Sequence, residues 1–313
     1  MTTKPILFFL DREPAAPWLK AFAELAPNIE VRTQDSWGDV REASYAFVWH
    51  PTPGLLKTYE NIDVIYSLGA GVDHLITDPD LPTDTPIVRM ADRGLKEGMA
   101  EYVVMSVISH HRQMPRMRVE QQKQNWAPFF PKPSSEITVG IMGYGTLGHH
   151  TAQQLKTFHY PINTWSTSPK EAEDGVTHFY GKDTLSAFLG RSDIVVNLLP
   201  STTDTYHILN SDSLAACKQG AAIINVGRGS ALDLTALIAA IKAGHIKAAT
   251  LDVFEQEPLP SDHPAWGMDE IVITPHISAV TQIRSAVEYV LESIRDYEAG
   301  KPLINQLDRN KGY

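Results

Sequence analysis

The stretch that decides the fold runs from Ile137 to Gly148 and reads ITVGIMGYGTLG. A short apolar, β-branched run leads into Gly143, Gly145 and Gly148 in G-x-G-x-x-G spacing, which is typical of a strand that turns sharply into a helix. In a dinucleotide site the first glycine permits the turn, the second lets a pyrophosphate approach the backbone, and the third allows close helix–strand packing. Glycine turns are common, so the rest of the chain must decide whether a cofactor binds here.

The chain after this motif alternates strand-like and helical stretches, as a parallel sheet with crossover helices requires. The predicted strands are 137–142, 161–165, 194–199, 221–226, 248–253 and 271–274. The predicted helices are 146–157, 184–189 with Asp183 as candidate N-cap, 211–218, 234–243 ended by Gly244, and 279–299 ended by Gly300. This pattern predicts a doubly wound α/β domain with the glycine motif at its first strand, and it favours dinucleotide binding.

The first third of the chain predicts a second unit of the same kind. Its strands are 6–10, 29–31, 45–49, 62–68 and 87–90, with an early helix around 18–25. The 62–68 strand runs into GAGVD at 69–73, where two glycines expose backbone N–H groups that suit a carboxylate or phosphate. A plain tight turn explains this stretch equally well.

A helix predicted from Lys96 to Gln121 leads into a segment that cannot be regular helix or central strand. The His110-His111-Arg112 run near the helix end is interpreted as a favourable C-terminal charge set, and no metal site is predicted. Residues 124–135, QNWAPFFPKPSS, are rich in proline and aromatic residues. We interpret them as an arm whose Trp126, Phe129 and Phe130 bury against another domain or subunit.

Composition narrows the class of protein. The 313 residues suffice for two domains, and 43% hydrophobic with 20% charged residues is a globular composition. The net charge of −10 argues against nucleic acid as a partner. Cys217 is the single cysteine and is interpreted as a small buried side chain, so no intrachain disulfide is expected. No stretch predicts a signal peptide or membrane helix, so a soluble cytoplasmic protein without a membrane partner is expected.

The end of the second predicted strand indicates which dinucleotide binds. NAD sites usually carry an acidic residue there, but this chain has STSPK at 166–170, with no carboxylate to repel a 2′-phosphate. Ser166, Thr167 and Ser168 offer hydroxyls and Lys170 offers a positive charge. NADP is therefore the preferred cofactor. NAD remains possible, because this stretch has no arginine to clamp a phosphate as a fork. The alternative is a turn with a solvated lysine.

Three charged residues follow three other predicted strands of this domain. They are Arg228 in NVGRG, Glu257 in LDVFEQEPLP and His276 in ITPHIS. Ligands of open parallel sheets bind outside the carboxyl ends of the strands. An arginine, a glutamate and a histidine there match anion binding, orientation and proton transfer in one active site.

These motifs together resemble the D-isomer-specific 2-hydroxyacid dehydrogenases, and within them the glyoxylate/hydroxypyruvate reductase A branch. The resemblance covers essentially the whole chain. It rests on 143–148, 225–229, 251–258 and 274–276, together with VWHP at 48–51, LGAGVD at 68–73, NLLP at 197–200, ITPH at 273–276 and the terminal Gly312-Tyr313.

The resemblance implies two Rossmann-like doubly wound parallel-sheet domains with a cleft between them. Residues 1–102 plus 278–313 would form the substrate domain and 103–277 the dinucleotide-binding domain. It also implies a homodimer with contacts around 113–135. The implied cofactor-binding residues, beyond those named at 166–170, are Gly143, Tyr144, Gly145, Thr146, Leu147, Gly148, Leu199, Pro200, Val226 and Asp252.

The implied reaction is NAD(P)H-dependent reduction of a small 2-oxo acid, glyoxylate to glycolate or hydroxypyruvate to glycerate. His276 would donate the proton, Glu257 would orient its imidazole, and Arg228 would clamp the substrate carboxylate and carbonyl. In the other domain, the backbone at Ala70, Gly71 and Val72 would bind the carboxylate and Trp49 would limit side-chain size. Two alternatives remain open: a non-catalytic NAD(P)-sensing, corepressor-like binding protein, and an oxidising dehydrogenase for another 2-hydroxy acid.

Overall fold

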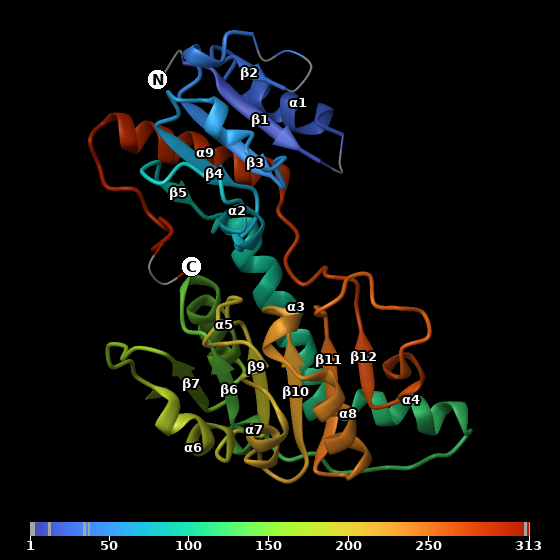
Figure 1. Ribbon diagram of the computed structural model, residues 1–313. Coiled ribbons are helices and arrows are strands. Elements are labelled where there is room, and N and C mark those ends of the chain that lie inside the picture. The colour runs from blue at the N-terminus through green and yellow to red at the C-terminus, as the bar shows by residue number, and fades with distance from the viewer. Residues whose placement is uncertain (1–3, 12–13, 34–35, 37, 310–311, 313) are drawn as a thin grey trace. The chain divides into compact units, whose positions relative to one another are not determined.

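The computed structural model describes residues 4–11, 14–33, 36, 38–309 and 312. The chain divides into two units, Met1–Leu95 with Val280–Tyr313, and Lys96–Ala279. Each unit has its own all-parallel sheet (Figure 1), which confirms the predicted fold class. Tyr313, one of the residues on which the resemblance rests, lies outside the described residues.

The sheet of the first unit, here called unit 1, has the strand order β2-β1-β3-β4-β5. Its strands are β1 (Ile6–Leu10), β2 (Val31–Arg32), β3 (Tyr45–Trp49), β4 (Val64–Ser67) and β5 (Ile87–Val88). Alternate residues of β1 and β3 point to opposite faces, and Phe8 and Phe47 pack with Trp18 and Phe22 of α1 (Ala16–Leu25). This aromatic cluster joins α1 to the sheet.

The last helix, α9 (Ile283–Glu298), returns to unit 1 from the far end of the chain. The Tyr45 hydroxyl donates to Glu298 Oε1 at 3.1 Å, and the Tyr66 hydroxyl donates to Ser293 Oγ at 3.2 Å. These bonds explain how both chain ends build one unit.

The sheet of the second unit, unit 2, has the order β12-β11-β10-β9-β6-β7-β8. Its strands are β6 (Val139–Met142), β7 (Ile162–Ser166), β8 (Val176–Tyr180), β9 (Ile194–Asn197), β10 (Ala221–Asn225), β11 (Ile246–Leu251) and β12 (Ile271–Ile273). From β6 the chain adds β7 and β8 on one side, and it then crosses to add β9 through β12 on the other side. The order of strands therefore reverses between β6 and β9, and the glycine motif that follows β6 lies at this topological switch point.

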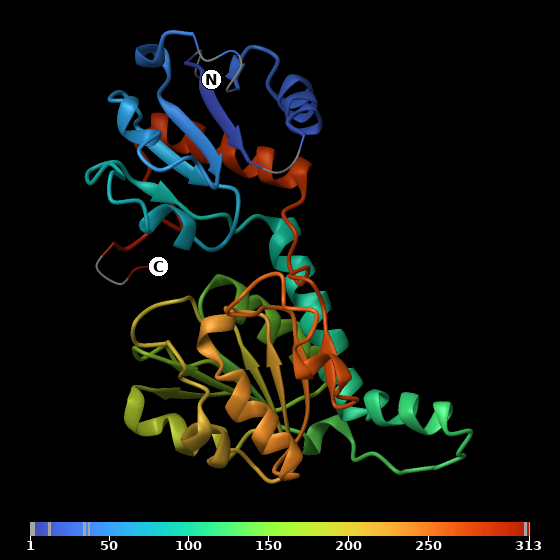
Figure 2. The same ribbon diagram turned by 45° about the vertical axis from the view of Figure 1, so that its right-hand side comes forward.

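Helices cover both faces of this sheet (Figures 1 and 2). Their apolar side chains form two core clusters. One face packs against α3 (Arg93–His111) and α5 (Thr146–Thr157), and the other against α6 (Leu185–Leu189), α7 (Ser211–Ala215) and α8 (Leu234–Lys242). Burial on both faces explains the nearly continuous apolar runs of the central strands.

Several predicted elements differ from the structure. β8 was not predicted, since its side chains are only partly buried and its sequence, VTHFY, lacks a continuous apolar run. The helix predicted from 96 to 121 is broken at Gln113, whose φ of 54° is left-handed, and α4 (Met114–Gln122) follows. Asp183 is not an N-cap, because it lies inside a 3₁₀ turn, Lys182–Thr184, that precedes α6.

His110 was wrongly interpreted as part of a charge set at the helix end. It is 1% exposed, and its Nε2 lies 2.8 Å from Thr250 Oγ1 of β11. Burial, and secondarily Lys247, lowers the pKa of His110 to about 4. The residue is a neutral core histidine.

Helix α4 and most of the predicted arm, residues 124–135, project from the body of unit 2 (Figure 2). No described residue of α4 is buried, and Trp126 and Phe130 are 94% and 96% exposed. Trp126 and Phe130 therefore lack a covering surface within the described chain, whereas Phe129 is partly buried and the Arg116 guanidinium lies over its ring, 5.9 Å from the ring centroid. No described helix is long and apolar enough to cross a bilayer.

Candidate active site

Five strand ends lie at one edge of the unit 2 sheet. Met142, Asn197, Asn225, Leu251 and Ile273 are in register across neighbouring parallel strands. The loops that follow them therefore leave the sheet at the same edge, where open α/β sheets bind ligands. These loops carry the glycine motif, Leu199 and Pro200, Arg228, Glu257, and His276.

His276 and Glu257 come from two of these loops and contact each other. His276 Nδ1 lies 2.8 Å from Glu257 Oε2, and Glu257 Oε1 accepts the backbone N–H of Phe254 at 2.9 Å. Both carboxylate oxygens are thus engaged, which holds Glu257 against the imidazole. The bond at Nδ1 leaves Nε2 as the nitrogen that can transfer a proton, and the side chain is 52% exposed.

A buried group beneath His276 fixes its turn. His276 has a left-handed φ of 56°, and Asp252 is fully buried. Asp252 Oδ1 accepts the Ile277 N–H and Oδ2 accepts the Ser278 N–H, both at 2.8 Å. The Thr274 hydroxyl also donates to Oδ1 at 2.6 Å. The predicted cofactor-binding residue Asp252 therefore uses its carboxylate to organise the turn that carries His276.

Arg228 follows β10 and is partly buried. Its Nη1 donates to the Gly227 carbonyl at 2.9 Å, and its own carbonyl accepts from Asn225 Nδ2 at 3.1 Å. Asn225 Oδ1 in turn accepts from Asn197 Nδ2 at 2.9 Å, and Asn197 Oδ1 accepts the Leu199 N–H at 3.2 Å. Two buried asparagines thus link the Arg228 and Leu199 loops. Their role was not predicted, although a polar residue that ends an all-apolar strand is a usable signal.

The glycine loop has the geometry that a dinucleotide requires. Gly143 has a φ of 96°, and a Cβ on Gly148 would lie 1.9 Å from the Gly143 carbonyl oxygen. A Cβ on Gly145 would instead meet no atom within 4 Å, so this glycine faces open space. Helix α5 begins with Thr146 and Leu147, and among the described residues no side chain caps its N-terminus. The open backbone and the helix terminus fit a pyrophosphate.

The residues after β7 divide into a buried and an exposed group. Ser166 is buried, and its hydroxyl donates to the Ser168 carbonyl at 2.7 Å. Thr167, Ser168 and Lys170 are exposed. The exposed side chains are therefore the ones that can meet a 2′-phosphate, while Ser166 shapes the turn.

Glu173, which sequence reasoning missed, ties this loop to the glycine motif. It accepts the Tyr144 hydroxyl at 2.7 Å and Lys156 Nζ at 3.2 Å, and it contacts Gln153 Nε2. Burial acts to raise the pKa of Glu173, but these three bonds outweigh it and lower the pKa to about 2. Tyr144 thus anchors the 167–175 loop through the Glu173 carboxylate, whose negative charge is paired with Lys156.

The remaining predicted residues lie as follows. Leu199 and Val226 are buried, and Pro200 is partly exposed. In unit 1, the backbone N–H groups of Ala70, Gly71 and Val72 make no hydrogen bond with the described residues. Neither Gly69 nor Gly71 has a positive φ, so the turn is not an alternating left-handed nest, but its amides are available to an anion.

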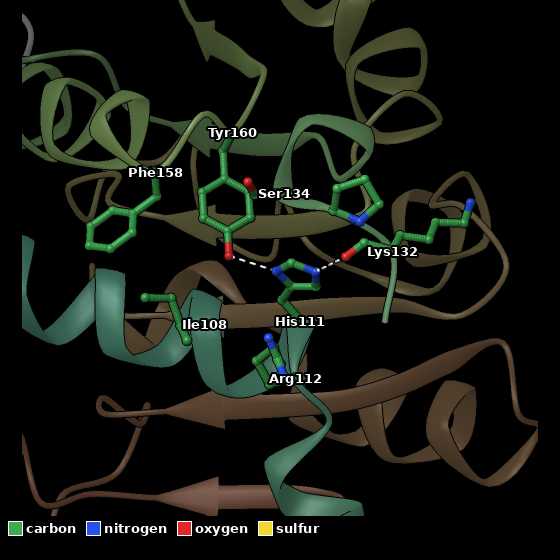
Figure 3. Close-up of a pocket in the computed structure, with 8 residues that line it drawn as sticks. Ile108, His111, Arg112, Lys132, Ser134, Phe158 and Tyr160 are labelled. Carbon is green, nitrogen blue, oxygen red and sulfur yellow. Dashed lines mark hydrogen bonds between the residues drawn. The ribbon is translucent and has the colours of Figure 1, made fainter. Parts of the chain in front are cut away.

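A cavity of about 260 Å³ lies away from these loops, beside the amino ends of β6 and β7 (Figure 3). His111 spans it, with Nδ1 2.8 Å from the Tyr160 hydroxyl and Nε2 2.8 Å from the Lys132 carbonyl oxygen. The cavity is therefore not part of the strand-end site. In the described part of the chain no group of three or more His, Cys, Asp or Glu could hold a metal ion.

Residues 104–278 match the family model described as "D-isomer specific 2-hydroxyacid dehydrogenase, NAD binding domain". The chain belongs to the D-isomer-specific 2-hydroxyacid dehydrogenase family. This confirms the predicted family, and the matched residues contain the glycine motif, Arg228, Glu257 and His276.

Relatives match over the full chain. A glyoxylate/hydroxypyruvate reductase A from Yersinia enterocolitica is 38% identical over 313 residues, which cover 98% of this chain and 99% of the relative. A family member from Xanthobacter autotrophicus Py2, solved with NADPH and MES, is 38% identical with a TM-score of 0.95 and 100% coverage of both chains. A glyoxylate/hydroxypyruvate reductase from Sinorhizobium meliloti, solved with NADP and sulfate, is 34% identical with a TM-score of 0.92, covering 99% of this chain and 100% of that one.

Proposed function

We propose that this protein reduces glyoxylate and hydroxypyruvate with NADPH. The observation that carries the proposal is the 2.8 Å pair of His276 and Glu257 at the ligand-binding edge of a dinucleotide-binding sheet. The names of the Yersinia and Sinorhizobium relatives support the same reaction. Under this proposal residues 103–277 form the dinucleotide-binding domain, and 1–102 with 278–313 form the substrate domain.

NADP is the proposed preferred cofactor, with NAD as the second choice. The pyrophosphate would lie against Gly145 and the N-terminus of α5, where a Cβ is absent and space is open. Thr167, Ser168 and Lys170 would meet the 2′-phosphate. The NADP-containing structures of the Xanthobacter and Sinorhizobium relatives support this preference.

In the proposed mechanism His276 donates a proton from Nε2 to the oxygen that develops negative charge at C2. When bound, NADPH would supply the hydride to C2. Glu257 holds Nδ1 and stabilises the positive charge that His276 carries before it donates. Arg228 binds the carboxylate and carbonyl of the 2-oxo acid as a fork, which a lysine could not reproduce. Within unit 1, the amides of residues 70–72 would suit a carboxylate.

We also propose a homodimer built on the arm. Trp126 and Phe130 are almost fully exposed, and exposed large aromatic side chains are typical of an interface. A second copy of the chain would cover them.

Purified protein assayed with each acid and each reduced nicotinamide tests the proposal. We expect turnover of glyoxylate and hydroxypyruvate, with NADPH favoured over NADH. His276→Asn should lower kcat by about 100-fold or more while leaving the Kd for NADPH unchanged. A wild-type protein that binds NADPH but reduces neither acid would contradict the proposal, and so would a fully active His276→Asn variant.

A further inference from the structure

We propose that Gly69, His50 and His74 position the Trp49 indole, and that the indole so held sets the largest C3 substituent that a 2-oxo acid can carry. This inference rests on the proposed function. It adds three positioning residues, which act through their contacts with the indole, and it gives Trp49 a fixed orientation. All four residues belong to unit 1.

Two imidazole rings flank the indole. The His50 ring centroid lies 4.9 Å from that of Trp49 at an interplanar angle of 86°, and the His74 centroid lies 4.4 Å away at 55°. The two imidazoles also contact each other, at 4.6 Å. Ring contacts of this kind fix an orientation as well as burying area.

The indole has no polar anchor within the described residues. Trp49 lies at the end of β3 and is only partly exposed, yet its Nε1 makes no hydrogen bond to a described group. Its orientation therefore depends on the neighbouring rings and on shape. His74, in the first turn of α2 (Asp73–Ile76), supplies the nearer ring.

Gly69 provides the space into which the indole fits. A Cβ on this residue would lie 2.5 Å from Trp49 Cζ3 and 2.8 Å from Cη2, closer than non-bonded carbons approach. The six-membered ring of the indole thus packs directly on the Gly69 backbone. Since Gly69 does not have a positive φ, its lack of a side chain is explained by this contact and not by backbone conformation.

This contact places the indole beside the proposed carboxylate-binding amides. Gly69 immediately precedes Ala70, Gly71 and Val72, whose N–H groups have no acceptor in the described chain. A 2-oxo acid bound there by its carboxylate brings its C3 substituent close to that carboxylate, and so within reach of the indole. A rigid indole excludes large substituents, whereas a smaller or mobile ring admits them.

The experiment measures kcat/KM for 2-oxopentanoate, whose C3 carries an ethyl group, relative to hydroxypyruvate, whose C3 carries a hydroxyl, with NADPH. Trp49→Phe should raise this ratio by about 10-fold or more, in the range expected when a pocket gains room for a methylene group. His74→Ala and Gly69→Ala should each raise it about fivefold, because the indole is freed or displaced. His74→Phe keeps a flanking ring and should stay near the wild-type ratio. Gly98→Ala, which adds a Cβ with no atom within 4 Å, is the control.

A merely structural role would lower kcat/KM for both acids equally and leave the ratio unchanged. Ratios within twofold of wild type in Trp49→Phe and His74→Ala would therefore overturn this inference while the proposed function stands. Wild-type protein that reduces neither glyoxylate nor hydroxypyruvate would overturn both. Trp49→Phe is a conservative change, so the test does not depend on the folding of Gly69→Ala.

Discussion

The backbone carbonyl of Asp252 accepts the backbone N–H of His276 at 2.8 Å, and the Asp252 carboxylate accepts the next two amides. The Thr274 hydroxyl donates to this carboxylate and must therefore accept from the Tyr102 hydroxyl, which lies 2.5 Å away. A fully buried carboxylate thus sets the left-handed turn from which the imidazole reaches Glu257.

This arrangement predicts that Asp252→Asn impairs catalysis without removing the imidazole. The amide NH₂ would face a backbone N–H, leaving donors without acceptors at a cost of about 1–3 kcal/mol. We expect kcat for glyoxylate to fall by about 10- to 100-fold through misplacement of His276, with the Kd for NADPH unchanged. Thr274→Ser keeps the hydroxyl and is the matched control. An Asp252→Asn variant with wild-type kcat would show that the turn carrying His276 keeps its conformation without the carboxylate.

Gly145→Ala should separate cofactor binding from folding. The new Cβ meets no protein atom within 4 Å, so the variant should fold, with only a small fall in melting temperature from the loss of glycine at the N-cap of α5. Gly98→Ala, which is also uncrowded, is the control for NADPH binding. A methyl group where the pyrophosphate approaches should weaken NADPH binding by about 10- to 100-fold. Calorimetric titration with NADPH measures this. Equal NADPH affinity in the two variants would move the pyrophosphate away from Gly145.

The sequence predicted those parts of the fold that depend on local pattern. The apolar runs of β6, β9 and β10 and the glycines at 143–148 have fixed spacing and a direct physical cause. Arg228, Glu257 and His276 could be proposed as a group because each follows a strand. β8 and the break at Gln113 could not, because partial burial and a left-handed glutamine leave no periodic signal.

Residues that act through contacts distant in sequence were harder to assign. Asp252 was predicted to bind the cofactor, and its contacts with Thr274, Ile277 and Ser278 become visible only in three dimensions. Glu173 and the Asn197–Asn225 pair were missed for the same reason. His110 was misassigned because charge at a helix end is the commoner role, and only packing on β11 buries it.

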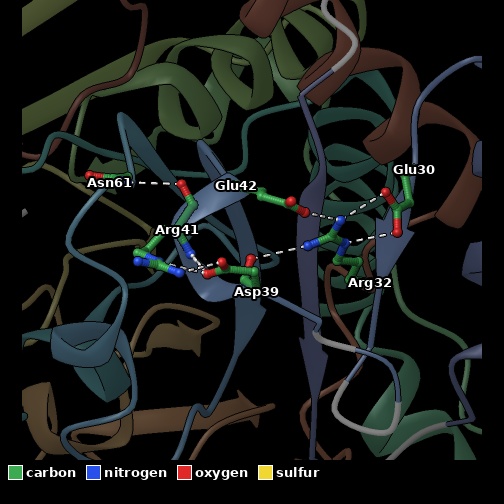
Figure 4. Close-up of polar contacts among 6 residues, drawn as sticks. All are labelled: Glu30, Arg32, Asp39, Arg41, Glu42 and Asn61. Carbon is green, nitrogen blue, oxygen red and sulfur yellow. Dashed lines mark hydrogen bonds and ion pairs between the residues drawn. The ribbon is translucent and has the colours of Figure 1, made fainter.

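Arg32 should contribute most of the polar stability at the β2 edge of unit 1 (Figure 4). Its side chain is 9% exposed, forms a fork with Glu30 at 2.8 and 3.0 Å, and reaches Glu42 at 2.6 Å. Arg32→Lys cannot make both contacts and should lower the free energy of unfolding by about 2 kcal/mol. Arg41→Lys, at an exposed pair with Asp39, is the control and should change little. Equal urea midpoints for the two variants would contradict this.

His110 should make the protein acid-labile through its depressed pKa. An unfolded histidine titrates near pH 6.5, whereas burial and then Lys247 hold the folded pKa at about 4. Above pH 6.5 both states are neutral and the residue contributes nothing to the pH dependence. Between the two pKa values only the unfolded chain binds the proton. The free energy of unfolding therefore decreases by about 1.4 kcal/mol for each unit by which the pH is lowered, or roughly 3 kcal/mol in all.

His110→Gln retains a hydrogen-bonding group for Thr250 but cannot titrate. Denaturant unfolding at neutral pH and near pH 4 should therefore show a smaller loss of stability in the variant than in the wild type, by about 3 kcal/mol. Carboxylates that titrate in this range are common to both proteins and cancel in the comparison. Parallel losses in the two proteins would mean that folded His110 takes up its proton at an ordinary pH.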